Sequence, residues 1–144
     1  MKVVIQRCKK SSVKYHNTEK TITSGLVVLV GFTNGDNATT IDYVVNKMLN
    51  LRIFDDEFGI MNKSLLDVDG EVLSISQFTL YANTEKGRRP SYIDALEPGV
   101  ASELYNIFNK KLKEKVKKVA TGLFGEEMLV TITNDGPVTI IIER

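Results

Sequence analysis

The sequence has very little of two residue types on which many hydrolases depend. It contains one cysteine, Cys8, and one histidine, His16. A lone cysteine excludes a disulfide within the chain and is compatible with a reducing cytosol. One cysteine and one histidine cannot form a zinc site of ordinary composition, so we expect no metal and no other cofactor.

The usual catalytic and cofactor-binding motifs are missing as well. The chain has no G-x-S-x-G nucleophile motif, no Walker-type phosphate loop and no dinucleotide-binding glycine motif. A side-chain triad is therefore not expected. Any catalysis would depend on backbone donors, a lone hydroxyl or the substrate itself.

Long hydrophobic runs are also absent. The longest covers residues 25–32, whereas a membrane-spanning helix needs roughly 20 apolar residues. Lys2 and Arg7 interrupt the N-terminal segment, which does not have the layout of a signal peptide. We therefore expect a cytoplasmic protein with no membrane partner.

What is present is typical of a globular protein. The chain has 144 residues, of which 42% are hydrophobic and 26% charged, and a formal net charge of +1. This predicts a single domain over residues 1–144 that is large enough for a core of its own. A net charge so near zero neither demands nor excludes a nucleic-acid partner.

The hydrophobic pattern predicts a mixed α/β domain. Strands are expected at residues 2–15, 19–24, 26–32, 52–54, 71–81, 128–133 and 138–143. Amphipathic helices are expected at Thr39–Leu51 and from about Pro98 to Ala120, with Gly122 ending the second. These elements favour an α+β fold: a curved, mainly antiparallel sheet or open barrel with two packed helices.

The first candidate motif is Ser76-Gln77-Phe78-Thr79-Leu80, where the strand predicted at 71–81 meets a polar loop. Strand alternation places Ser76 and Phe78 on one face, and Gln77 and Thr79 on the other. Taken alone, the motif is more typical of a sheet edge whose hydroxyls bond to neighbouring backbone.

The second candidate motif is Asn134-Asp135-Gly136-Pro137-Val138-Thr139. Pro137 cannot donate a ladder hydrogen bond, so the segment is a turn or a bulge between two apolar strands. A Gly-Pro bond adopts the cis form at modest cost, which would redirect the glycine carbonyl. Without the family resemblance, the sequence favours a plain hairpin turn.

Together the two motifs resemble the signature motifs of the D-aminoacyl-tRNA deacylases. Five further segments resemble that family in the same order along the chain: 3–7, 25–31, 51–54, 86–92 and 121–125. The resemblance implies an enzyme that hydrolyses the ester joining a D-amino acid to the terminal ribose of tRNA, as chiral proofreading in translation. Glycyl-tRNA would be a second substrate class, since glycine has no side chain to reject.

The resemblance also implies roles for individual residues. The catalytic set would be Ser76, Gln77, Phe78 and Thr79, with backbone N–H groups near Phe78 and Thr79 as oxyanion donors. The substrate-binding set would be Leu80, Arg7, Gly136, Pro137, Val138 and Thr139.

The same resemblance implies a homodimer. A cis Gly136–Pro137 bond would reach into the partner's pocket, and Arg7 would help to hold this loop. The carbonyls of the loop would take the amino group of a D-aminoacyl ester and clash with the side chain of the L-enantiomer.

Two basic clusters are candidates for RNA contact. Lys86, Arg88 and Arg89 follow the first motif closely, and we predict that they bind tRNA phosphates. A second cluster crowds the end of the predicted second helix: Lys110, Lys111, Lys113, Lys115, Lys117 and Lys118. This cluster fits either RNA contact or a solvated outer face. No DNA partner is expected.

Two alternatives remain open from the sequence. One is a nucleic-acid-binding module that shares the fold but does not hydrolyse an ester. The other is an editing domain that acts in trans to remove an L-amino acid. The intact motifs favour the D-specific hydrolase.

Overall fold

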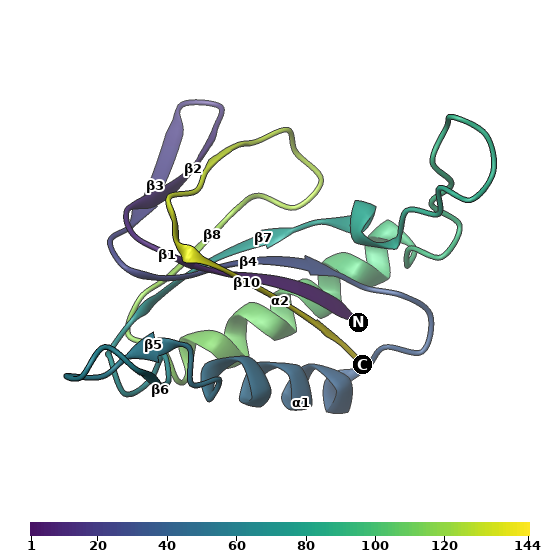
Figure 1. Ribbon diagram of the computed structural model, residues 1–144. Helices are drawn as coiled ribbons and strands as arrows, with labels where there is room; N and C mark the ends of the chain where they lie inside the picture. The colour runs from purple at the N-terminus through teal and green to yellow at the C-terminus, as the bar shows by residue number, and fades with distance from the viewer.

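The computed structural model describes all residues 1–144 as a five-stranded sheet, a three-stranded sheet, a two-stranded hairpin and two α-helices (Figure 1). The strands are β1 (Lys2–Cys8), β2 (Ser11–Tyr15), β3 (Thr18–Ile22), β4 (Gly25–Gly31), β5 (Phe54–Asp55), β6 (Met61–Lys63), β7 (Glu71–Ser76), β8 (Val119–Thr121), β9 (Leu129–Thr131) and β10 (Asn134–Glu143). The helices are α1 (Ala38–Leu49) and α2 (Pro98–Lys113), and a short 3-10 helix, η1, covers Phe78–Tyr81. Neither α-helix is long and apolar enough to cross a membrane.

The larger sheet has the strand order β10-β1-β4-β7-β8. β1 is antiparallel to both β10 and β4, whereas β7 is parallel to both β4 and β8. The parallel pairs arise because the chain crosses over through α1 between β4 and β7, and through α2 between β7 and β8. The predicted α+β fold with two packed helices is therefore confirmed, and its main sheet is mixed.

The core lies on both faces of this sheet. α1 and α2 pack together on one face, below the sheet in Figure 1, over a cluster of 22 buried residues. The smaller sheet, in the order β3-β2-β9, covers part of the other face over a cluster of seven buried residues. α1 forms as its pattern predicts: Ile41, Val44 and Met48 are buried, and the side chain of Asn37 caps its first turn.

Several predicted strands differ in extent from those of the structure; the strand predicted at 52–54, for example, is β5 at Phe54–Asp55. The strand predicted at 2–15 is divided into β1 and β2, with a bend at Lys9 and Lys10. β7 stops at Ser76, and the chain then turns into η1, so strand alternation does not apply beyond that residue. β10 begins at Asn134 and not at residue 138, because Asn134 already pairs with Cys8 of β1.

The second helix is shorter than predicted. α2 ends at Lys113, and the chain leaves it through turn hydrogen bonds to the carbonyl of Leu112. Val116 and Val119 continue the helical spacing but pack on the core from a turn and from β8. Gly122 therefore follows a strand and does not end a helix.

Candidate functional site

A pocket of about 700 Å³ lies where β4, β7 and η1 meet the first turns of α2. Its walls are residues 30–32, 75–78, 95–98 and 124–128, together with Tyr92, Ala101 and Val130. Of the first motif, Ser76, Gln77 and Phe78 lie in this lining. The walls contributed by residues 95–98 and 124–128 were missed from the sequence, because they come from segments remote from both motifs.

Gln77 is the residue at which the strand gives way to η1. Its backbone N–H donates to the carbonyl of Val30 (2.7 Å), and its Nε2 donates to Oγ1 of Thr79 (2.5 Å). Thr79 is thus held by Gln77 and does not itself line the pocket. Leu80 lies in a different hollow, where its carbonyl accepts from Nζ of Lys2 (3.5 Å).

Two backbone donors at the start of η1 are unpaired. Phe78 and Thr79 are its first two residues, so their N–H groups have no acceptor within the helix. No loop carbonyl or side chain accepts from them either. The ring of Phe78 is 58% exposed and lies edge-on to the ring of Tyr92, with 5.0 Å between the ring centroids. The start of η1, next to the pocket, therefore carries two N–H groups without an acceptor beside an exposed aromatic pair.

Gly31 allows the end of β4 to approach this turn closely. A Cβ at this position would lie 2.9 Å from the carbonyl oxygen of Gln77 and 3.2 Å from Cβ of Leu80. Any side chain here would displace the segment that carries the free donors. The glycine thus positions the first motif.

The electrostatic character of the pocket is acidic. Three carboxylates line it, from Glu97, Glu126 and Glu127, and no lysine, arginine or histidine does. The backbone N–H groups of Gly99 and Val100 hold the pKa of the Glu97 carboxyl below its usual value. Glu97 caps α2, and Glu126 lies 3.4 Å from Nε2 of His16. Glu127 is therefore the carboxylate left without a partner to favour a positively charged ligand, such as an ammonium group.

The second motif forms a bulge at the edge of the large sheet. Asn134 pairs with Cys8 and Thr139 with Gln6, so the four residues between them have only one residue of β1 opposite. The Gly136–Pro137 bond is cis, as the resemblance implies, and both residues are exposed. Gly136 has a φ of +124°, a conformation that L side chains rarely adopt.

Arg7 and Asn134 hold the base of this bulge. Arg7 is only 8% exposed; its Nη1 donates to the carbonyl of Ile53 (2.8 Å) and its Nε to that of Asp135 (3.2 Å). Nη1 also lies 3.4 Å from a carboxylate oxygen of Asp55. Nδ2 of Asn134 donates to the carbonyls of Arg7 (2.9 Å) and Val138 (3.0 Å).

Asn134 and Asp55 were not among the predicted site residues. The place of Asn134 directly before the Asp-Gly-Pro turn is a signal that could have identified it, since asparagine often bonds nearby backbone in turns. Nothing local marks Asp55, which is 48 positions away from Arg7. Of the remaining predicted residues, Val138 packs on the core and Oγ1 of Thr139 accepts from Gln6 (3.2 Å).

The two motifs lie at opposite ends of β1. Lys2 pairs with Gly31, beside Gln77, whereas Cys8 pairs with Asn134. Six residues of extended chain separate these points, which is about 20 Å. One copy of the chain therefore does not bring the two motifs into one site.

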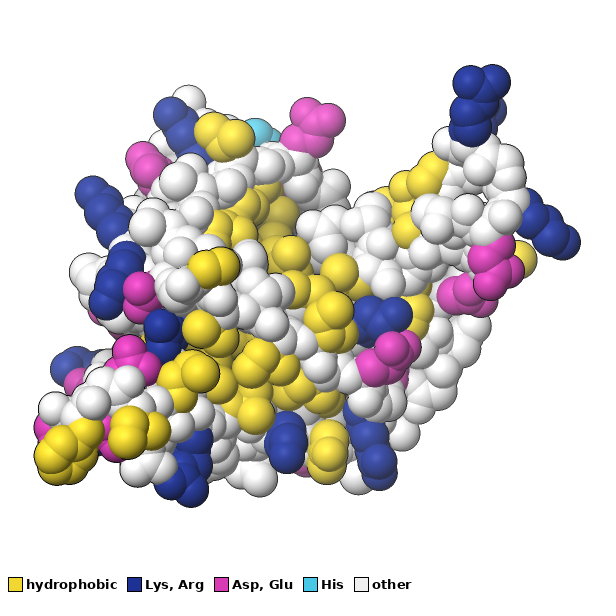
Figure 2. Space-filling view, in the orientation of Figure 1, with side chains coloured by type: hydrophobic (Ala, Val, Ile, Leu, Met, Phe, Trp, Pro, Cys, Tyr) yellow, Lys and Arg dark blue, Asp and Glu magenta, His cyan; other side chains and the backbone are white.

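The predicted RNA-contacting residues Lys86, Arg88 and Arg89 lie outside the pocket. They are exposed in the loop that projects beyond η1, and basic side chains mark the tip of that loop in Figure 2. None of them has a carboxylate partner. Their contact with RNA stays a prediction.

Comparisons with known proteins agree over the whole chain. The model of the family described as D-Tyr-tRNA(Tyr) deacylase matches residues 4–143. A "D-aminoacyl-tRNA deacylase" of Clostridium tetani (strain Massachusetts / E88) is 54% identical over 144 residues, covering 99% of this chain and 97% of its own length. One from Bacillus cereus (strain B4264) is 50% identical, covering 99% of each chain.

Two solved structures are similar as well. The structure titled "c-Myc DNA Unwinding Element Binding Protein" has a TM-score of 0.94 and 38% identity, covering 100% of this chain and 99% of that one. The structure titled "Structural Analysis of a probable eukaryotic D-amino acid tRNA deacylase" has a TM-score of 0.85, covering 98% and 97%. At 16% identity, the second likeness shows a shared fold.

Proposed function

The chain belongs to the D-Tyr-tRNA(Tyr) deacylase family, and from this premise we propose that it hydrolyses the ester of D-aminoacyl-tRNA in the pocket beside Phe78. The products are free D-amino acid and tRNA, and the role is chiral proofreading in translation, in the cytoplasm. The catalytic and substrate-binding residues are those that the two motifs supply, with the Gly136–Pro137 loop coming from a second copy of the chain.

The observation that carries this proposal is the pair of unpaired N–H groups of Phe78 and Thr79. Attack on an ester carbonyl places negative charge on its oxygen, and fixed backbone donors stabilise that charge without any rearrangement. The carboxylates of the pocket suit the ammonium group of an aminoacyl ester. Such a pocket attracts the positively charged ammonium group of the substrate and stabilises the negative charge that develops on the ester oxygen in the transition state.

The reaction itself needs little from side chains. Water adds to the ester carbonyl, the bond between that carbon and the ribose oxygen breaks, and the ribose oxygen takes up a proton. The only histidine, His16, lies at the tip of the β2–β3 hairpin with its Nε2 3.4 Å from a carboxylate oxygen of Glu126, and it is not in the pocket lining. The neighbouring 2′-hydroxyl of the substrate takes the place of a side-chain base, and the fixed geometry of the bound ester supplies the rest of the rate enhancement.

A dimer brings the two motifs together. Within one chain they lie about 20 Å apart along β1, so a partner related by a two-fold axis has to place its exposed Gly136–Pro137 loop at the first copy's pocket. The outer edge of β10 is unpaired and Ile141 on it is 63% exposed. Hydrophobic side chains gather in the middle of this face, over β1, β4 and β10 (Figure 2). A partner chain that covered this surface would remove the open strand edge and the exposed apolar side chains from water, which supports the same arrangement.

The carbonyls of the partner's loop then act as the chirality filter. They accept hydrogen bonds from the amino group of a D-aminoacyl ester, and they occupy the space into which an L side chain would point. Glycine has no side chain to clash, so glycyl-tRNA is a second substrate. Because this filter consists of backbone atoms, it excludes the direction in which an L side chain points, whichever amino acid is present.

The direct test compares hydrolysis of D-tyrosyl-tRNA and L-tyrosyl-tRNA by the purified protein. We expect rapid release of D-tyrosine and negligible release of L-tyrosine, with glycyl-tRNA also hydrolysed. Equal rates for the two enantiomers, or none for either, would contradict the proposal.

The assembly is tested separately by light scattering at the concentration of the hydrolysis assay. We expect a mass of twice the 16.1 kDa chain. A fully active monomer would show that the pocket does not need a partner's loop.

A second candidate is DNA binding without hydrolysis, which is suggested by the name of the similar structure at 38% identity. It would use the basic surfaces and not the acidic pocket. Tight binding of duplex DNA by a protein that hydrolyses no aminoacyl ester would favour it over the deacylase.

A further inference from the structure

A second groove of about 720 Å³ is lined by the segment Gly122–Phe124, of which Phe124 also lines the pocket. Its walls come from the β2–β3 hairpin, from the segment after β8 and from the exposed side of α2. We call it the lysine groove and define it by Tyr15, Lys20, Asn106, Lys110, Lys113 and Phe124, which all lie in its lining.

The ion pairs of the lysine cluster separate its members into two kinds. Three of the six lysines between residues 110 and 118 have carboxylate partners: Lys111 with Asp42, Lys117 with Asp69 and Lys118 with Glu71. Lys110 and Lys113, which line the groove, have none. Lys20 donates to the carbonyl of Thr121 (2.9 Å), which leaves its charge unbalanced. One acidic residue, Glu114, faces these three lysines in the groove.

The remaining lining combines aromatic rings with neutral polar groups. The rings of Tyr15 and Phe124 line the groove, and Nζ of Lys20 lies 5.5 Å from the ring centroid of Tyr15. Ser102 and Asn106 of α2 also line it. Unbalanced cations beside aromatic rings are typical of channels for single-stranded nucleic acid, and serine and asparagine commonly bond phosphate and sugar oxygens.

The lysine groove adjoins the pocket. Phe124 lines both hollows, and α2 runs along both, with Ala101 in the pocket and Lys110 and Lys113 in the groove. At 1.5 Å per residue, the two lysines lie about 14 and 18 Å farther along the helix than Ala101. Glu126 and Glu127 line the pocket on the loop side and Glu97 lines it at the start of α2, whereas the groove holds the three lysines. A polyanion that leaves the pocket is therefore attracted toward the groove.

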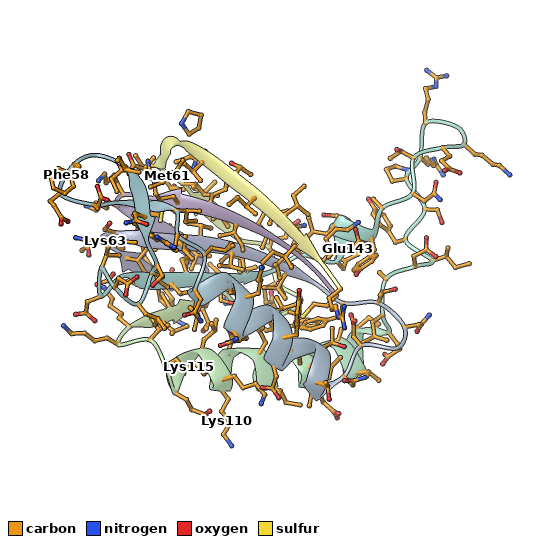
Figure 3. All side chains as sticks on the ribbon, turned by 60° about the horizontal axis from the view of Figure 1, so that its bottom comes forward. Phe58, Met61, Lys63, Lys110, Lys115 and Glu143 are labelled. Carbon is orange, nitrogen blue, oxygen red and sulfur yellow. The ribbon has the colours of Figure 1, made fainter.

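We propose that the lysine groove binds the sugar-phosphate backbone of the single-stranded 3′ end of tRNA, immediately before the terminal nucleotide whose ester lies in the pocket. The inference rests on the proposed function, since it assumes that the terminal ribose occupies the pocket. Lys110 projects from α2 on the side away from α1 (Figure 3), where an RNA strand can reach it.

Binding of uncharged tRNA, measured by fluorescence anisotropy at about 0.1 M salt, tests the groove without requiring hydrolysis. The double variant Lys110→Gln/Lys113→Gln removes two phosphate contacts. At a salt slope of about 0.7 per contact on a single strand, this predicts roughly twentyfold weaker binding and a slope lower by about 1.4. The control Lys115→Gln/Lys117→Gln changes the net charge equally on exposed residues outside the groove. We expect it to keep the wild-type affinity.

An unchanged affinity in the groove variant, or equal losses in both variants, would overturn the inference. So would duplex DNA of the same length that competes as well as tRNA does. Hydrolysis of D-tyrosyl-tRNA separates this inference from the function on which it rests. A wild-type protein that binds tRNA through the groove but hydrolyses no D-aminoacyl ester would contradict only the proposed function. D-specific hydrolysis by a protein whose tRNA binding does not depend on Lys110 and Lys113 would contradict only the inference about the groove.

Discussion

The two motifs lie beside opposite ends of β1, and the fold holds them in opposite ways. At one end Arg7 is buried and bonds the carbonyls of Ile53 and Asp135, while Asn134 joins both sides of the bulge. At the other end Phe78 is mostly exposed and its N–H group is unpaired. The first end is complete within one chain, and the second is left open to receive a ligand. Substitutions of Arg7 or Asn134, which hold the base of the bulge, should therefore reduce stability most, and those beside Phe78 should reduce activity most.

The largest effect is expected from Phe78→Pro compared with Phe78→Ala. Both variants lose the ring, but only the proline variant loses the N–H donor. Proline is tolerated at the first position of a helix, and Gln77 before it (φ −148°, ψ 84°) lies outside the α region that a following proline disfavours. Loss of one oxyanion donor costs roughly 100- to 1000-fold in kcat, so Phe78→Pro should be slower than Phe78→Ala by that factor. Equal rates in single-turnover assays would remove this N–H from the mechanism.

At the end of β1 beside the Gly136–Pro137 bulge, Arg7→Leu should mainly reduce stability. The substitution leaves two backbone carbonyls and the Asp135 carboxylate without their buried partner. Removing one member of such a buried network costs about 3 kcal/mol. Urea denaturation measures the loss. The matched control is Lys9→Ala, which breaks an exposed ion pair with the same carboxylate and should cost no more than about 0.5 kcal/mol. Similar costs for the two variants would mean that Arg7 does not anchor the bulge.

Beside Phe78, Gly31→Ala should instead reduce activity more than stability. The added Cβ would lie 2.9 Å from the carbonyl of Gln77, so the turn that carries the donors has to move by a few tenths of an ångström. Overpacking of this kind costs about 1 kcal/mol in stability. Small misplacements of catalytic groups cost more in rate, and we expect kcat/KM to fall roughly tenfold. Wild-type kcat/KM in a destabilised variant would show that the position of this turn is unimportant.

The same contrast explains how far the sequence alone could predict the molecule. Elements with one periodic apolar face were located to within a few residues; α1 covers Ala38–Leu49 against a prediction of Thr39–Leu51. Their ends were less predictable. Val116 and Val119 keep helical spacing after α2 has ended, because both contact the same core from non-helical backbone. A local pattern records burial and does not record which backbone conformation achieves it.

The two motifs could be recognised in the sequence because each is a short continuous segment. The contacts that hold them could not, because Arg7 meets Ile53 across 46 positions and Asp55 across 48. The acidic pocket wall formed by Glu97 and Glu126 is likewise assembled from distant segments. Side-chain chemistry was thus predictable where it is local. The geometry that long-range packing creates was not predictable from the sequence.

The smallest effect at the open end is expected from Thr79→Ala, and it decides between backbone and side-chain catalysis. Oγ1 of Thr79 accepts a hydrogen bond from Gln77, and the residue does not line the pocket. Alanine removes that contact, worth about 1 kcal/mol, but keeps the N–H group. We therefore expect kcat for D-tyrosyl-tRNA to fall by no more than about fivefold, with KM unchanged. A nucleophilic hydroxyl would behave differently, since its removal would abolish turnover while tRNA still bound with wild-type affinity. Single-turnover rates and tRNA affinity measured on the same preparation separate the two mechanisms.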